Sequence, residues 1–301
     1  MPALHLLGTG AALSDPHRTT TMLAVSDDAA PSNTLLIDCG GDVLQRLQAC
    51  GPSIDSVSAL IVTHAHMDHT SGFPLFMEKI WLDGRDRSIP ICGIEPALAQ
   101  ARRLWDAFEP VHEGWDDLPP IDWHEVRHKR DARVWTQAPW TVTAAPVDHG
   151  DMPNVGLRFE HNPTDRVIAY SCDTAPTSSV VHLARNADVL VHEANDVGDN
   201  HSTAAGAAEV AVSESYGPHV AGWCITFFGV VAAVVVVIRG VETARFVTLN
   251  AGLVLLIGLL GSTFFSVELS LLTRGAAFIG LGIGLFVLNF ILSRRLRGSE
   301  R

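Results

Sequence analysis

The residues best suited to chemistry follow an apolar run at positions 59–63. Directly after this run come His64, His66, Asp68 and His69, four side chains with metal-binding atoms. Imidazoles and a carboxylate crowded at the end of a strand lose hydration and repel one another unless a cation gathers them. Because a mixture of nitrogen and oxygen ligands suits Zn²⁺ or a similar divalent ion, the segment predicts a metal site.

The elements that must position this segment alternate between short apolar runs and helical patterns from position 1 to position 216, which predicts an α/β domain. The expected strands are 3–7, 22–25, 34–38, 59–63, 89–92, 141–147, 156–160, 167–171 and 189–192. The expected helices are 42–49, 73–81, 95–108, 176–184 and 203–215. Turn signals such as Gly51-Pro52 separate them.

Composition narrows the class of protein further. The chain has 301 residues, of which 47% are hydrophobic, and this excludes wholesale disorder. The segment 1–219 carries a net charge of −16 and holds only two lysines. This argues against an extended basic surface that binds nucleic acid. Five cysteines without a C-x-x-C pair favour a reducing compartment over a disulfide framework. The N-terminus shows no signal-peptide pattern.

The chain changes character after position 219, where we place the boundary between domains 1–219 and 220–301. The second part has a net charge of +4 and three nearly uncharged stretches, 220–238, 246–267 and 275–292. Each stretch approaches the roughly 20 residues needed to cross a bilayer. We therefore expect two or three transmembrane helices, the first stretch having a buried helix or strand pair as its alternative. The protein is expected at a membrane, with its N-terminal domain in the cytoplasm.

The spacing at positions 64–69 matches H-x-H-x-D-H, and the sequence in this respect resembles the metallo-β-lactamase superfamily. Positions 7–10 (LGTG) and 33–40 (NTLLIDCG) are similar to early motifs of its ribonuclease Z and arylsulfatase-like branch. The resemblance spans about residues 3–216. It implies a four-layer αββα sandwich with the metal ions at the edge between two sheets.

The resemblance also implies further metal ligands at the ends of later strands. His149 would complete the first metal site, and Asp173 would bridge two metals, with Asp68 and His69 serving the second. A turn histidine and a turn cap are the alternative interpretations of His149 and Asp173. One or two Zn²⁺ ions are the expected cofactor, with Mn²⁺ or Fe as alternatives.

The segments 192–195 (HEAN) and 201–203 (HST) look like paired elements of ribonuclease Z. By this resemblance His201 would protonate the leaving group or stabilise charge in the transition state, and Glu193 would orient it. Asp68 is the third residue that we assign to catalysis. The alternatives are a surface acid at position 193 and a simple helix cap at 202 or 203.

The chain departs from the family after the 203–215 helix. There the family continues with a strand ending in a last histidine, which completes the second metal site. This chain offers only His219, preceded by Gly217-Pro218, with no apolar strand to position it. We therefore expect the last strand to be missing.

These features predict a metal-dependent hydrolase that uses a metal-bound hydroxide on a phosphodiester or another small ester. Residues 109–140 lack the Lys-rich Gly-Pro arm expected of ribonuclease Z, so nucleic acid is not the favoured partner. Two alternatives stay open: a membrane protein carrying an inactive remnant of this fold, and a ribonuclease Z-like tRNA 3′-processing endonuclease. Assembly into a homo-oligomer is also left open.

Overall fold

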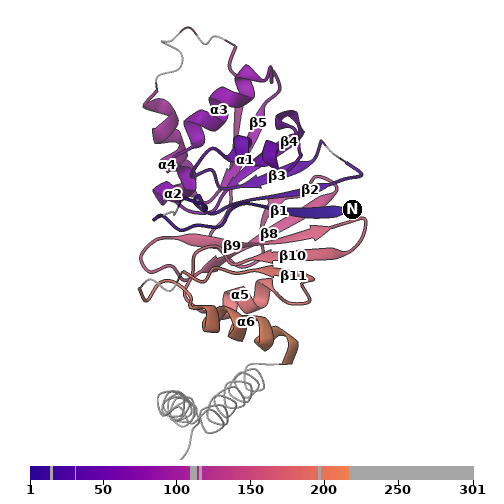
Figure 1. The fold of residues 1–301 in the computed structure, drawn as a ribbon, viewed down its shortest axis with the longest axis vertical. Coiled ribbons are helices and arrows are strands. Elements are labelled where there is room, and N and C mark those ends of the chain that lie inside the picture. The colour runs from indigo at the N-terminus through magenta and orange to yellow at the C-terminus, as the bar shows by residue number, and fades with distance from the viewer. Residues whose placement is uncertain (14–15, 31, 109–113, 115–116, 196–197, 217–301) are drawn as a thin grey trace, which may run out of the picture. The chain divides into compact units, whose positions relative to one another are not determined.

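The computed structural model describes residues 1–216, except 14–15, 31, 109–113, 115–116 and 196–197. Two β-sheets pack face to face, and helices cover the outer face of each sheet (Figure 1). The four-layer α/β sandwich predicted from the sequence is therefore confirmed for this part of the chain.

The first sheet carries its strands in the order β1-β2-β3-β4-β5-β6. They are β1 (Pro2–Gly8), β2 (Met22–Asp27), β3 (Thr34–Ile37), β4 (Val57–Val62), β5 (Ile89–Gly93) and β6 (Ile121–Glu125). The first three strands pair antiparallel, whereas β3 to β6 pair parallel. The carboxyl ends of β3 to β6 consequently meet at one edge of the sheet, where β4 leads into the histidine-rich segment.

The second sheet has the order β11-β10-β9-β8-β7. Its strands are β7 (Ala132–Trp135), β8 (Trp140–Val147), β9 (Asn154–His161), β10 (Arg166–Tyr170) and β11 (Val189–Val191). Strands β7 to β10 pair antiparallel, and β11 adds parallel to β10. Because β8, β10 and β11 run in the same direction, the segments that follow them reach the same edge. Within the described part of the chain, β11 pairs with β10 alone.

Helices α1 (Val43–Ala49), α3 (Phe73–Leu82) and α4 (Glu95–Asp106) cover the first sheet, and α5 (Ser178–Leu183) and α6 (Ala204–Tyr216) the second (Figure 1). A one-turn helix, α2 (Met67–Thr70), and a short 3-10 helix, η1 (Ile54–Ser56), complete the helices described. The Asp42 carboxylate caps α1 by accepting from the Gln45 backbone N–H at 3.1 Å. Prolines in the first turns of α3 and α4 suit those positions, where a missing N–H costs nothing.

The core lies between the two sheets and beneath the helices. Strands β2 and β3 are buried along their whole length, which explains the apolar runs 22–25 and 35–37 that they contain. The largest fully buried side chains of the core include Trp140, Phe73, Phe76 and Phe159. They belong to the second sheet and to α3. Burial of such aromatic groups supplies much of the driving force that holds the strand ends in place.

Two strands were missed by the sequence analysis. Strand β6 alternates only weakly, since it is partly exposed and carries Asp122, His124 and Glu125. Strand β7 has four residues, one of them the exposed Arg133. Their pairing with β5 and β8 makes them strands, because strand propensity is decided largely by neighbours.

The domain boundary at position 219, His219 and the three apolar stretches after it lie outside the described residues. Over the residues described, which end at 216, no helix combines the length and the apolar character needed to cross a membrane. The membrane tail and the missing last strand therefore remain predictions.

Gly40 gives a test of how tightly the fold holds the histidine-rich segment. A β-carbon at Gly40 would lie 1.5 Å from the backbone oxygen of Asp68, so Gly40→Ala must displace main chain. We expect a loss of about 3 kcal/mol in the free energy of unfolding. The control is Gly41→Ala, whose β-carbon would have side-chain atoms as its nearest neighbours, those of Thr19 at 3.2 Å, Met22 at 3.5 Å and Thr20 at 3.7 Å. Urea unfolding followed by tryptophan fluorescence measures both, and equal midpoints would contradict the expectation.

Candidate metal centre

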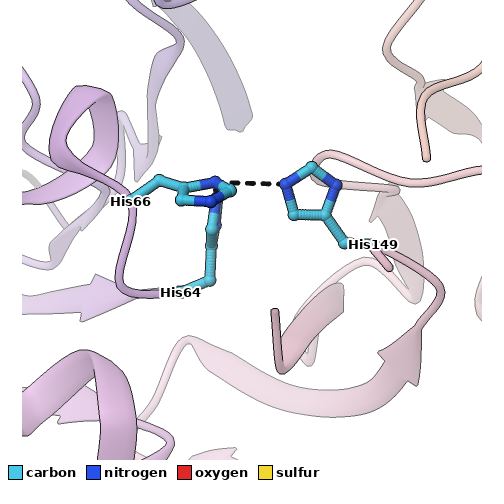
Figure 2. A group of neighbouring side chains, drawn as sticks. All are labelled: His64, His66 and His149. Carbon is cyan, nitrogen blue, oxygen red and sulfur yellow. Dashed lines mark hydrogen bonds between the residues drawn. The ribbon is translucent and has the colours of Figure 1, made fainter. Parts of the chain in front are cut away.

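Three histidine rings converge at the edge where the two sheets meet. His64 and His66 follow β4 of the first sheet, and His149 follows β8 of the second (Figure 2). His66 Nδ1 lies 3.0 Å from His64 Nε2 and 3.1 Å from His149 Nε2. Three ring nitrogens that face one another at this spacing can serve as the donor set of a divalent metal ion.

The second nitrogen of two of these rings is held by a neighbour. His64 Nδ1 lies 3.1 Å from the Thr63 hydroxyl, and His149 Nδ1 donates to the backbone oxygen of Asn200 at 3.1 Å. Such outer contacts fix the tautomer and the orientation of a metal-binding imidazole. Both Nε2 atoms are thereby directed toward the centre.

A second donor group lies next to the first. His69 Nε2 is 3.6 Å from Asp68 Oδ2 and 3.5 Å from Asp173 Oδ2. Asp173 follows β10. A carboxylate oxygen of Asp173 and ring nitrogens of His149 and His201 also lie within 4.8 Å of one another. Asp173 therefore stands between the two groups, where a bridging carboxylate would have to be. The structure thus brings together all six residues that the sequence analysis assigned to metal binding.

Asp38 organises the centre, although the sequence analysis gave it no role. Its carboxylate accepts from His69 Nδ1 at 2.7 Å, from the Thr63 backbone N–H at 2.8 Å and from the Thr63 hydroxyl at 2.9 Å. Asp38 is fully buried and has a φ of 59°, which lies in the left-handed region. An acid placed directly after a buried strand is the signal that could have identified it.

Burial and mutual charge set the protonation of the centre. Burial lowers the pKa of His64 well below its usual range, and burial with His149 lowers that of His66. Both rings are therefore neutral at pH 7, the form that binds a metal. Burial also opposes charge on His69, but Asp38 and Asp173 outweigh it and raise the pKa of His69 well above its usual value. Burial opposes charge on Asp173 too, yet His69 outweighs it and lowers the pKa of that carboxyl.

An acid and imidazole pair lies beside the donor groups. His201 Nδ1 is 3.0 Å from Glu193 Oε1 and 3.1 Å from Oε2, and the His201 ring is centred 4.9 Å from that of His149. Glu193 also accepts from the backbone N–H groups of Thr174 and Asn195, so the carboxylate is fixed from several sides. A carboxylate held in this way can fix the orientation of the His201 ring.

The helix-cap alternative proposed for the residues after His201 coexists with this arrangement. The Thr203 hydroxyl accepts from the Gly206 backbone N–H at 3.0 Å, and the Ser202 hydroxyl donates to the Thr174 backbone oxygen at 2.6 Å. Capping α6 and anchoring it to the loop after β10 hold His201 at the edge of the sandwich.

A cleft of about 580 Å³ opens beside the second donor group. Asp68, Asp173 and Glu193 line it, together with Gly8 at the end of β1 and Gly10 in the loop that follows. The metal centre is therefore reachable from a space that could hold a small substrate.

Comparison with protein families gives one match over most of the described residues. The model described as "Beta-lactamase superfamily domain" matches residues 33–217. This range contains all the donor residues named above and the three catalytic candidates, Asp68, Glu193 and His201.

Individual relatives agree with this match. The ribonuclease Z of Mycolicibacterium gilvum (strain PYR-GCK) is 30% identical over 237 residues, covering 70% of this chain and 80% of that protein. The ribonuclease Z of Mycobacterium bovis (strain BCG / Pasteur 1173P2) is 31% identical over 203 residues, 64% of this chain and 70% of that protein. The crystal structure of the short form of human tRNase Z shares the fold, with a TM-score of 0.59 and 21% identity over 70% of this chain and 88% of that one. The chain therefore belongs to the metallo-β-lactamase superfamily, in its ribonuclease Z-like branch.

Proposed function

We propose that the chain is a metal-dependent phosphodiesterase. The observation that carries the proposal is the convergence of His64, His66 and His149, in which Nδ1 of His66 lies 3.0 and 3.1 Å from the Nε2 atoms of the other two rings. Neutral imidazoles can satisfy such a contact only in part, because each offers one donor and one acceptor. A divalent cation satisfies all three nitrogens at once.

The donor set fits Zn²⁺, which takes imidazole nitrogens and carboxylate oxygens in tetrahedral sites. His64, His66 and His149 would hold one ion with Asp173, and Asp68 and His69 would hold a second with the other side of Asp173. When bound, the ions supply an activated water and stabilise negative charge on the reacting group. Mn²⁺ and Fe remain alternatives to Zn²⁺ at these residues.

The protein's own contribution to the reaction comes from His201. Glu193 holds its Nδ1, and this leaves Nε2 to donate a proton to the leaving oxygen of the substrate. Glu193 acts through His201, which it orients. Asp68 lines the cleft next to the second donor group, where it would face a bound substrate.

A tRNA-processing endonuclease is the second candidate function. The curated relatives named ribonuclease Z favour it, since an RNA backbone is itself a phosphodiester. The net charge of −16 over positions 1–219 favours a smaller diester.

The proposal also includes attachment of the domain to the cytoplasmic side of a membrane through residues 220–301. The apolar stretches of that segment support it.

Zinc content and turnover test the proposal directly. The full chain purified in detergent should contain about two zinc ions and hydrolyse bis(p-nitrophenyl) phosphate. His64→Ala should reduce turnover at least about 100-fold and lower the zinc content measured by elemental mass spectrometry. His124→Ala, at an exposed histidine of β6, is the matched control and should change neither. A chain without zinc or turnover would favour the inactive remnant instead.

The role of His201 is tested with two leaving groups. His201→Ala should lower kcat about 100-fold or more for a diester with an alkoxide leaving group, because that group must be protonated. The loss should be much smaller for p-nitrophenolate, which leaves without a proton. Glu193→Gln should show the same preference with a smaller loss, and zinc content should stay at the wild-type level in both variants. Equal losses for the two substrates would rule out a general acid at this position.

A further inference from the structure

The connection between β6 and β7 gathers positive charge in an otherwise acidic domain. Positions 126–133 read VRHKRDAR, which includes four of the 21 Lys and Arg residues of the chain and gives this stretch a net charge of +3. The segment 1–219 as a whole carries −16. A run of charge opposite in sign to its surroundings attracts anions locally.

This connection lies at the edge of the sandwich that carries the metal centre. Strands β4, β5 and β6 pair parallel, so β6 ends where β4 ends, and β7 begins where β8 ends because these two strands pair antiparallel. The His128 ring donates from Nε2 to the backbone oxygen of Asn154 at 3.1 Å, and the Asn154 side-chain amide donates to the Asp173 backbone oxygen at 2.7 Å. The basic connection is therefore anchored to a residue that also holds the loop after β10.

Three cationic side chains of the connection line one recess. The recess has a volume of about 420 Å³ and is lined by Arg127, Lys129 and Arg133, together with Ala132 and two carboxylates. The three cationic side chains are exposed, and none has a hydrogen-bond or ion-pair partner among the residues that the structure describes. Like charges that share a recess repel one another, so an anion between them is favoured.

The two carboxylates at the recess, those of Asp131 and Glu125, do not neutralise it. Asp131 Oδ1 lies 2.8 Å from Nε2 of His182 in α5, which engages this carboxylate from outside the recess. Glu125 is the last residue of β6 and adds one negative charge. The cationic groups are in excess even when both carboxylates are counted, and this excess is left for a ligand.

The lining of the recess favours a small oligoanion over a nucleic acid. No Phe, Tyr or Trp is among the described residues that line it, so a base finds no ring on which to stack. A long polyanion would also extend over the acidic surface of the domain. A diphosphate group is compact and offers separate ionised oxygens to two guanidinium groups and one ammonium group.

We propose that the recess lined by Arg127, Lys129 and Arg133 is a binding site for a diphosphate group, either free or carried by a nucleoside. The guanidinium groups of Arg127 and Arg133 each pair with phosphate oxygens through parallel N–H donors, and the Lys129 ammonium adds a third positive charge. The site is separate from the metal centre and requires no hydrolysis, so the inference goes beyond the proposed function.

Amine modification is a specific probe of this recess, because Lys79 and Lys129 are the two lysines of the chain. Lys79 pairs with Asp42 and serves as the internal reference. In the full chain purified in detergent, saturating pyrophosphate at constant ionic strength should slow acetylation of Lys129 about tenfold, since a bound anion stabilises the protonated amine. The rate at Lys79 should stay unchanged. Peptide mass spectrometry measures both rates.

Substitutions identify the groups that bind the anion. Arg127→Gln and Arg133→Gln should each raise the pyrophosphate concentration that half-protects Lys129 about tenfold, since a hydrogen bond to a charged group is lost. Arg103→Gln, on the exposed surface of α4, is the matched control and should leave this concentration unchanged. His64→Ala should leave it unchanged as well, because the metal centre is not part of the site.

Comparison of ADP with pyrophosphate distinguishes the two sources of the diphosphate group. Protection of Lys129 at a lower concentration of ADP than of pyrophosphate would assign a nucleoside-borne group, and protection by pyrophosphate at an equal or lower concentration would assign the free one. The inference would be overturned by absent protection, by equal slowing at Lys79, by indifference to the arginine variants, or by stronger protection from a single-stranded oligonucleotide. Absence of diester hydrolysis in a chain that still shows this protection would contradict the proposed function alone.

Discussion

The approach of three imidazoles across the seam between two sheets is the constraint on which the rest of the structure depends. His64 and His149 are almost fully buried, so water cannot relieve the contact between their ring nitrogens and His66. The contact exists because β4 and β8, from different sheets, end at the same edge of a packed core. The apolar surface buried between the sheets holds donor atoms at a spacing that a divalent cation, rather than a hydrogen bond, satisfies fully.

Hydrogen bonds from neighbouring residues hold the metal-binding side chains in position. Asp38 joins β3, the end of β4 and His69 through one carboxylate, and its left-handed backbone is a conformation that costs of order 1 kcal/mol for a residue other than glycine. The cost is offset by bonds to Thr63 and His69. Asn154 similarly donates to the Asp173 backbone oxygen at 2.7 Å, which anchors the loop after β10. Such supports keep ligands within the narrow geometry that a metal centre requires.

Charge links metal binding to substrate binding. The proposed function requires cations at the centre, because the carboxylates of Asp68, Asp173 and Glu193 that line the cleft would otherwise repel an anionic substrate. The net charge of −16 over positions 1–219 acts differently, because a long polyanion extends over more of the acidic surface than one diester does.

The sequence by itself determined the buried strands and the histidine-rich segment, because both depend on neighbours along the chain. Uninterrupted apolar runs specify strands covered on both faces, and four donor groups within positions 64–69 need no folding to be recognised. The resemblance to a family added His149 and Asp173. Only the tertiary structure joined Asp38 to His69, brought Glu193 to the same cleft as Asp68 and made β6 a strand. These contacts join segments far apart in the chain, and their partners follow from how the sheets pack, which no local pattern records.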